Sequence, residues 1–345
     1  MNDHARSLQT VAAGVGTAAV GICLLLSTGG CEGQAPAAAA PPTALSPASR
    51  PEGPGVDPDE ASKVEPPQVQ LPDPPQPAPR TDNRPSDPDQ IYPWTRKRED
   101  YEPIAARFAP PPGAIRAPAP AGSYAHWLRH LPLRAPGTAV RSYDDRVILS
   151  ADDGRLAAVV DLDLIGQDLQ QCADTVLRLR AEYLRVRGRH EAITFDYTNG
   201  WASRWSRWKA GFRPRLVGNH EVKIVRRAAD DSRQSFDRYL LDLFSYAGTV
   251  SLAREASEVK PGAIEAGDFF ILPGGPGHTV LVLDLARDGE GQTYALLGQG
   301  FMPAQDFQVL RASSRSPWYR LDPEAPVDTP MWKPFPWSSL RRLER

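Results

Sequence analysis

The sequence predicts an α+β domain that follows a long proline-rich segment. Three observations predict this organisation. Within the predicted domain, segments with apolar residues at helical spacing come first. Short β-rich segments follow one another near the C-terminus, and the domain shows no internal repeat. The proline-rich segment before the domain has almost no aliphatic runs.

The start of the chain reads as targeting sequence and linker. In this chain of 345 residues, Arg6 precedes Val11 to Leu26, an uncharged run typical of a signal peptide and short for a membrane-spanning helix. Residues 32–120 contain 23 of the 36 prolines, and such a segment cannot bury enough apolar surface to offset its ordering entropy. We predict a signal peptide over 1–31, a disordered linker over 32–103 and a globular domain over 104–345.

Small residues stand directly before Cys31, at positions 27–30. This pattern resembles the lipobox of bacterial lipoproteins, in which the cysteine takes a diacylglycerol and becomes the mature N-terminus. Thr28 stands where lipoboxes usually carry Leu, so ordinary signal cleavage and an uncleaved anchor remain alternatives. The resemblance implies an exported protein of the cell envelope that is lipid-anchored to a membrane at Cys31.

The charge balance argues against a nucleic-acid partner and against a strongly acidic partner. The chain has 40 Lys and Arg against 42 Asp and Glu, a formal net charge of −2. The arginine-rich stretch from Arg178 to Arg189 is the one local exception that we single out, and we interpret it as a solvated helix face. The expected partners are a membrane, through the anchor, and an envelope polymer.

The first elements of the predicted domain are a helix, a strand and a longer helix. Gly122–Leu133 is predicted as a short helix that stops at Pro132, and Ala157–Leu164 as a strand. Asp168 can cap the long helix, which runs to about Arg187. Its apolar stripe consists of Leu169, Cys172, Val176, Leu179 and Tyr183.

The later elements lead into a series of strands. Ala192–Tyr197 is predicted as a strand and Ser235–Leu252 as a helix broken around Gly248. Between them, three tryptophans at helical spacing favour a core position over sugar stacking: Trp201, Trp205 and Trp208. The last predicted strands are Phe269–Leu272, Thr279–Leu285, Tyr294–Gln299 and Gln308–Leu310.

Three polar residues occur in an order typical of thiol hydrolases. Cys172, the one cysteine in the predicted domain, is expected in the first turn of a helix, where a thiol pKa can be lowered. His278 opens a strand and Gln299 ends the next, so antiparallel pairing would set an amide beside an imidazole base. Backbone N–H groups near Cys172, with Gln170 or Gln171, would bind an oxyanion.

Each of these residues also has a structural interpretation. Cys172 on an apolar stripe can be a small core residue, His278 a turn histidine and Gln299 the cap of a strand edge. His126 and His130 lie four apart and could share a metal, but no third ligand is obvious, so no metal is expected. His126 could instead position a substrate.

The ordered trio resembles the papain-like cysteine peptidases, in particular the NlpC/P60 and CHAP branch of bacterial envelopes. The resemblance is carried by Gly267-Asp268-Phe269-Phe270 and Gly277-His278-Thr279-Val280. The gap from Cys172 to His278 is longer than usual, and Cys172 lacks the preceding Asp and the following Ser-Gly of those families. The resemblance implies a papain-like helix-plus-antiparallel-sheet fold and a Cys-His-amide triad.

A closer resemblance covers most of residues 104–340. The phrases GSYAHWLRHLPL, DLQQCADTVLRLRAEYL, FSYAGTVSL, GDFFILPGGPGHTVLVLD and GQGFMPAQDFQVL look like the bacterial family catalogued as domain of unknown function 4846. This resemblance implies an exported or lipid-anchored protein and brings no established activity. Cys172, His278 and Gln299 all lie inside these phrases.

The leading hypothesis is a cell-envelope thiol hydrolase that cleaves an amide bond, with peptidoglycan stem peptides as the first candidate substrate by analogy. Cys172 would attack, His278 would transfer the proton and Gln299 would orient the ring. The alternative is a non-catalytic envelope lipoprotein that binds a glycan or a protein partner. No cofactor is expected in either case.

Overall fold

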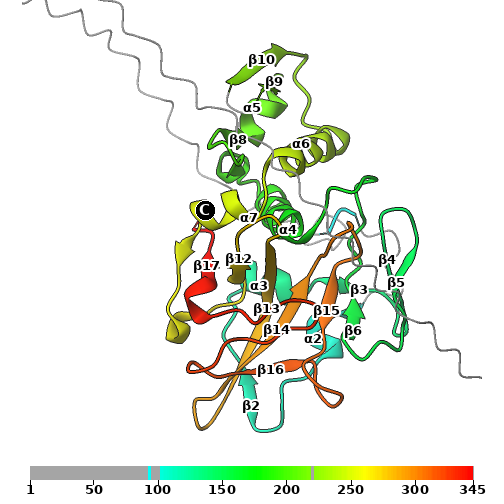
Figure 1. The fold of residues 1–345 in the computed structure, drawn as a ribbon, viewed down its shortest axis with the longest axis vertical. Helices are drawn as coiled ribbons and strands as arrows, with labels where there is room; N and C mark the ends of the chain where they lie inside the picture. The colour runs from blue at the N-terminus through cyan, green and yellow to red at the C-terminus, as the bar shows by residue number, and fades with distance from the viewer. Residues whose placement is uncertain (1–91, 95–101, 219–220, 345) are drawn as a thin grey trace, which may run out of the picture. The chain divides into compact units, whose positions relative to one another are not determined.

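The computed structural model describes residues 92–94, 102–218 and 221–344 (Figure 1). The helices and 3₁₀ turns are α2 Ile104–Arg107, α3 Tyr124–Arg129, α4 Cys172–Val186, η1 His190–Ala192, α5 Trp205–Lys209, α6 Arg233–Tyr246, α7 Thr249–Glu255, η2 Pro261–Ala263 and η3 Trp337–Ser339. The strands before α6 are β1 Glu102–Pro103, β2 Ala114–Arg116, β3 Pro132–Leu133, β4 Val140–Arg141, β5 Val147–Leu149, β6 Leu156–Val159, β7 Thr194–Asp196, β8 Ala202–Arg204, β9 Phe212–Val217 and β10 Glu221–Arg226. The later strands are β11 Ser257–Glu258, β12 Phe269–Leu272, β13 His278–Asp288, β14 Thr293–Gln299, β15 Gln308–Leu310, β16 Trp318–Leu321 and β17 Leu340–Arg342.

Nine of these strands, within the described residues, form one antiparallel sheet. Its main order is β11-β17-β12-β13-β14-β15-β6, while β16 also pairs with β14 and β2 with β13. Strand β13 lies near the middle and pairs antiparallel with β12, so that Leu272 is opposite His278 and Phe270 opposite Val280. Helices and an antiparallel sheet in one domain confirm the predicted α+β class.

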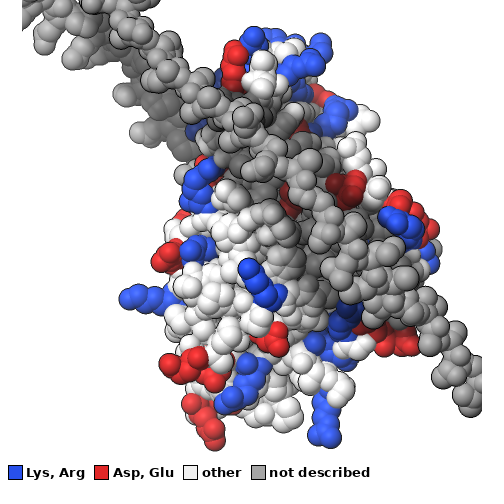
Figure 2. Space-filling model, in the orientation of Figure 1, with Lys and Arg blue, Asp and Glu red and all other residues white. Residues whose placement is uncertain are grey.

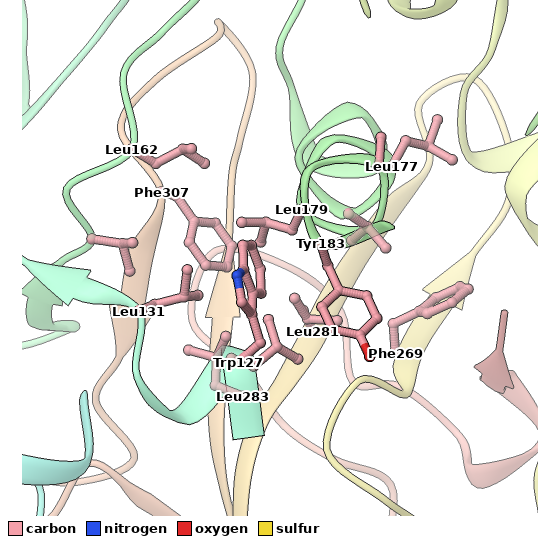
Figure 3. Packing of buried hydrophobic residues seen from close by; sticks show 14 of the residues in the cluster. Trp127, Leu131, Leu162, Leu177, Leu179, Tyr183, Phe269, Leu281, Leu283 and Phe307 are labelled. Atoms are coloured by element: carbon pink, nitrogen blue, oxygen red, sulfur yellow. The ribbon is translucent and has the colours of Figure 1, made fainter. Parts of the chain in front are cut away.

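Strand β13 is buried on both faces, which explains why its sequence from Val280 to Ala286 is apolar except for Asp284. Leu281 and Leu283 pack with side chains of α4 and α3 in the cluster that Figure 3 shows. Val280 and Val282 belong to a second cluster, made with side chains of the C-terminal segment. The sheet therefore has α4 on one face and the C-terminal segment on the other.

Helix α4 begins later than the sequence predicts. The expected cap, Asp168, lies outside the helix, and its carboxylate accepts a hydrogen bond from the Ala304 N–H at 2.7 Å. Gln171 is the N-cap residue instead, and its backbone N–H donates to the Asp174 carboxylate at 3.1 Å. Because residues 168–171 form a turn before the helix, Cys172 becomes the first residue of α4.

A smaller region lies between α4 and β12 in the sequence. It contains the hairpins β7–β8 and β9–β10 and the helices α5 and α6 (Figure 1). Trp205 and Trp208 of α5 are buried against Tyr239 of α6, with ring centroids 5.6 and 5.8 Å apart. The predicted tryptophan helix therefore starts at Trp205, because Trp201 lies before β8.

The packed part of the chain extends N-terminal of residue 104. Tyr92 and Trp94 are buried, and their rings lie 5.2 and 5.9 Å from that of Trp127. The Tyr92 hydroxyl donates to the Trp127 carbonyl oxygen at 2.7 Å. Residues that we assigned to the linker thus contribute to the core of the domain.

The expected signal peptide, with Cys31, and the expected linker as far as residue 91 lie outside the described residues. Residues 95–101 lie outside them as well. Among the helices that the structure does describe, none combines the length and the apolar character needed to cross a membrane.

Candidate functional site

The turn between β12 and β13 places His278 at the first position of β13. Gly277, just before it, is closely surrounded: a Cβ atom there would lie 2.2 Å from Thr249 Oγ1 and 2.8 Å from the Leu272 carbonyl oxygen. Two of the atoms around it belong to the backbone and cannot easily move, so the position requires glycine. The tight turn sets His278 at the strand end beside β14.

His278 and Gln299 meet across adjacent strands. His278 Nε2 lies 2.8 Å from Gln299 Oε1. With the amide oxygen as acceptor, Nε2 carries the proton and Nδ1 keeps its lone pair. Nδ1 is buried and has no hydrogen-bond partner among the described residues. Gln299 therefore orients the ring and leaves one basic nitrogen without a partner.

Aromatic side chains enclose the His278 ring. The rings of Phe301 and Trp332 lie 4.8 and 4.9 Å away, and that of Phe335 lies 6.1 Å away. His278 is 0% exposed. Burial lowers the pKa of His278 to about 4, although the hydrogen bond to Gln299 acts in the opposite direction. The imidazole is therefore neutral at pH 7.

Cys172 lies in the first turn of α4, with its sulfur against the backbone that flanks His278. The thiol donates to the Gly277 carbonyl oxygen at 3.9 Å. Burial raises the pKa of Cys172 to about 11, and the charge of Asp174 adds to this, while backbone N–H groups, including that of Thr279, lower it. The predicted lowering of the thiol pKa is thus wrong, because burial and a nearby carboxylate outweigh the helix N-terminus.

Within the described residues, no hydrogen bond joins the thiol to the imidazole. Side chains alternate along β13, so His278 shares a face with Val280, whereas α4 covers the face of Leu281. The sulfur and the ring lie at the same end of β13, on opposite sides of the strand. The structure thus brings His278 and Gln299 into contact and places Cys172 against the neighbouring backbone.

The two glutamines expected to bind an oxyanion already have partners in and around α4. The Gln170 side chain is buried, and its Oε1 accepts from Arg178 Nη1 at 2.5 Å. The Gln171 Nε2 donates to the Asp168 carboxylate at 3.2 Å. The backbone N–H groups of the first turn of α4 are therefore the better candidates for oxyanion binding.

His126 interacts with its own helix rather than with Cys172. Its ring lies 4.2 Å from that of His130, and its backbone N–H donates to Ser123 Oγ at 3.1 Å. Burial lowers the pKa of His126, and the charges of His130 and Arg129 lower it further. Among the described residues, no group of three or more His, Cys, Asp or Glu side chains is arranged to hold a metal ion.

Two features of the site were not predicted. Asp174 is buried two residues after Cys172, and burial raises its pKa to about 8. Its place in the first turn of an amphipathic helix was the available signal. In the aromatic cover, Phe301 follows Gln299 by only two residues, whereas Trp332 comes from a segment distant in sequence and gave no such signal.

The comparisons with known proteins identify a family without assigning an activity. No curated protein and no solved structure matches the chain. A family model with the description "Domain of unknown function (4846)" matches residues 104–342, which is well over half of the chain and includes Cys172, His278 and Gln299. The chain therefore belongs to the family described as domain of unknown function 4846.

Proposed function

We propose that this domain is a thiol hydrolase that cleaves an amide bond, with Cys172 as nucleophile and His278 as base. The supporting observation is the 2.8 Å contact of Gln299 Oε1 with His278 Nε2, which leaves the buried Nδ1 without a described partner. An imidazole held in this way has one oriented nitrogen and one nitrogen that can accept a proton.

In the proposed reaction, the Cys172 sulfur bonds to the carbonyl carbon of the amide while the thiol proton passes to His278 Nδ1. Backbone N–H groups at the start of α4 stabilise the oxyanion. The C–N bond then breaks, and His278 returns the proton to the leaving amine. Water attacks the thioester, gives a proton to His278, and the carboxylic acid leaves as the proton returns to the sulfur.

The proposed site is closed and uncharged at rest. The thiol pKa of about 11 and the imidazole pKa of about 4 leave both groups neutral at pH 7. The imidazole and the thiol also lie on opposite sides of β13. In this proposal, substrate binding displaces the aromatic cover over His278 and rearranges the first residues of β13, so that the ring can reach the sulfur. In this account, Phe301 and Trp332 keep the site inactive until substrate arrives.

The papain-like fold and the substrate class belong to the same proposal. A cysteine in the first turn of a helix, packed on an antiparallel sheet that carries the histidine and the amide on adjacent strands, supports a papain-like arrangement. Export and a lipid anchor at Cys31 would hold the domain near peptidoglycan. Replacing Cys31 with Ser should release the protein from the membrane fraction; an unchanged membrane fraction would contradict the anchor.

Turnover of muropeptides tests the proposal. Full-length protein should release amines from purified muropeptides, as measured by mass spectrometry, and Cys172→Ala should abolish this release. Gln299→Ala should lower the rate about 10- to 100-fold, because the ring loses its orientation but keeps its base. Arg315→Glu, an exposed control, should have no effect. Equal release by the Cys172→Ala variant would show that another group does the chemistry.

The burial of the thiol favours a second candidate, a non-catalytic envelope protein that binds a glycan or a protein partner. Cys172 is only 5% exposed, and its raised pKa is typical of an inert core thiol. In that case His278 and Gln299 would be a buried structural pair. This candidate predicts no turnover and no effect of Cys172→Ala on binding of the partner.

A further inference from the structure

A hollow outside the cysteine site lies between the β9–β10 hairpin and the helices α5 and α6. Its volume is about 760 Å³, within the range of sites for small ligands. The residues that line it belong to the smaller region between α4 and β12, and none of them is part of the proposed hydrolase site. Figure 2 shows Lys and Arg side chains gathered at this end of the molecule.

Positive charge predominates in the hollow. Its charged residues are Arg213, Arg215, Arg227, Arg238, Asp230 and Asp242. Asp230 is paired with Arg238 at 2.9 Å. Asp242 accepts a hydrogen bond from the Tyr197 hydroxyl, and burial raises the pKa of Asp242 to about 6. Two carboxylates therefore face four guanidinium groups, which leaves a net positive site.

The hairpin places two cations directly opposite each other. Arg215 on β9 is the register partner of Lys223 on β10. Like charges in this position destabilise a hairpin, and a two-stranded hairpin is only marginally stable by itself. Glu221 lies 3.6 Å from the Lys223 amine, but both side chains are exposed and such a pair contributes little. Arg215 lines the hollow and Lys223 does not, so an anion bound beside Arg215 would weaken this repulsion.

Aromatic side chains form part of the wall. Trp208 and Tyr246 line the hollow, and the Arg213 guanidinium lies 4.3 Å from the centre of the Trp208 ring. Trp208 is largely buried, and its Nε1 has no hydrogen-bond partner within the described part of the chain. The wall thus offers apolar ring surface beside charged groups.

We propose that this hollow binds an acidic saccharide, a sugar that carries a carboxylate or a phosphate. The arginines can hold the acidic group through paired hydrogen bonds. Asp230 and Asp242 can accept hydrogen bonds from sugar hydroxyls, and the aromatic wall can contact the ring. A nucleic acid would bring its phosphates against the two aspartates, and a bilayer surface is too flat to enter a hollow. The proposal does not depend on Cys172.

Titration calorimetry of the full-length protein tests this proposal. Trigalacturonate provides carboxylates, mannose 6-phosphate provides a phosphate, and maltotriose is the neutral control. We expect binding of at least one acidic sugar, no binding of maltotriose, and affinity at least tenfold lower for Arg215→Glu. This variant pairs an acid with Lys223, so it should stabilise the hairpin, and lost binding would not reflect unfolding. Arg315→Glu, with the same charge change on an exposed residue outside the hollow, should bind as the wild type does.

Three results would overturn the proposal. The first is equal affinity of the wild type and Arg215→Glu for the acidic sugar. The second is binding of neither acidic sugar. The third is tighter binding, by the same residues, of a single-stranded oligonucleotide or of phosphatidylglycerol vesicles, which would assign the hollow to another class of partner.

Discussion

The cysteine site and the β9–β10 region use polar side chains in opposite ways. His278 and Gln299 are buried, uncharged at pH 7 and enclosed by aromatic rings. Arg215 and Lys223 are exposed, charged and opposite each other. The first pair is held by the surrounding core and needs a structural change before it can meet a substrate. The second is open to a ligand in the structure as it stands, because water rather than core packing stabilises its charges.

A buried ionic contact connects the two regions, and breaking it should have the largest effect. Glu182 of α4 is fully buried and lies 2.7 Å from Arg233 of α6. Arg178, which we expected on a solvated helix face, is 0% exposed, so that interpretation is wrong at this position. Glu182→Gln removes a buried charge but keeps the shape, and it leaves Arg178 with Asp163 and Arg233 with Asp237 as the remaining carboxylates. Urea unfolding should show a loss of about 3–5 kcal/mol. Glu290→Gln, at an exposed site, should change stability by less than about 0.5 kcal/mol.

The apolar cores of the two regions should also differ. Leu281 in β13 is fully buried under α4, whereas Ile224 in β10 is 42% exposed. Leu281→Ala should lower the free energy of unfolding by about 2–5 kcal/mol, because it leaves a cavity. Ile224→Ala should lower it by less than about 1 kcal/mol. Equal losses in urea titrations of the two variants would mean that the hairpin is packed as tightly as the sheet.

A smaller and pH-dependent effect is expected at Asp174. Its folded-state pKa, about 8, is raised from the ordinary value of 3.8, so its contribution to stability is fully present below about pH 4. That contribution is lost as the pH rises through 8. Asp174→Asn should therefore be more stable than the wild type at pH 8 and no more stable at pH 4.

Chemical denaturation at the two pH values measures this difference. Asp231→Asn, at an exposed position, is the matched control and should change stability by less than about 0.5 kcal/mol at both pH values. A wild type that is as stable as Asp174→Asn at pH 8 would mean that the carboxyl is solvated in the folded protein.

Local patterns predicted the sheet better than the smaller region. The strands over Phe269–Leu272 and Gln308–Leu310 and the break at Gly248 agree with the structure, since apolar alternation and glycine act locally. The β9–β10 hairpin was missed. Its first strand contains Pro214 and the charged Arg213 and Arg215, which weaken a strand pattern. Pairing with β10 provides the backbone hydrogen bonds that hold this segment as a strand.

For the site, the order of residues was predictable but their electrostatics was not. Strand pairing of β13 with β14 could be expected from sequence, and it brings His278 to Gln299. The lowered pKa of His278 depends on burial by Trp332 and Phe335, which lie far along the chain. A desolvation effect that comes from tertiary contacts cannot be read from the residues next to His278 in sequence.

Acylation by p-nitrophenyl acetate measures whether Cys172 and His278 act as a catalytic pair, and it needs no knowledge of the natural substrate. We expect a burst of nitrophenolate from the folded full-length protein and an acetyl group on Cys172, located by mass spectrometry. His278→Ala should abolish the burst and Gln299→Ala should slow it. If Cys172 stays unmodified until urea unfolds the domain, or if His278→Ala reacts as fast as the wild type, then Cys172 and His278 do not form a catalytic pair.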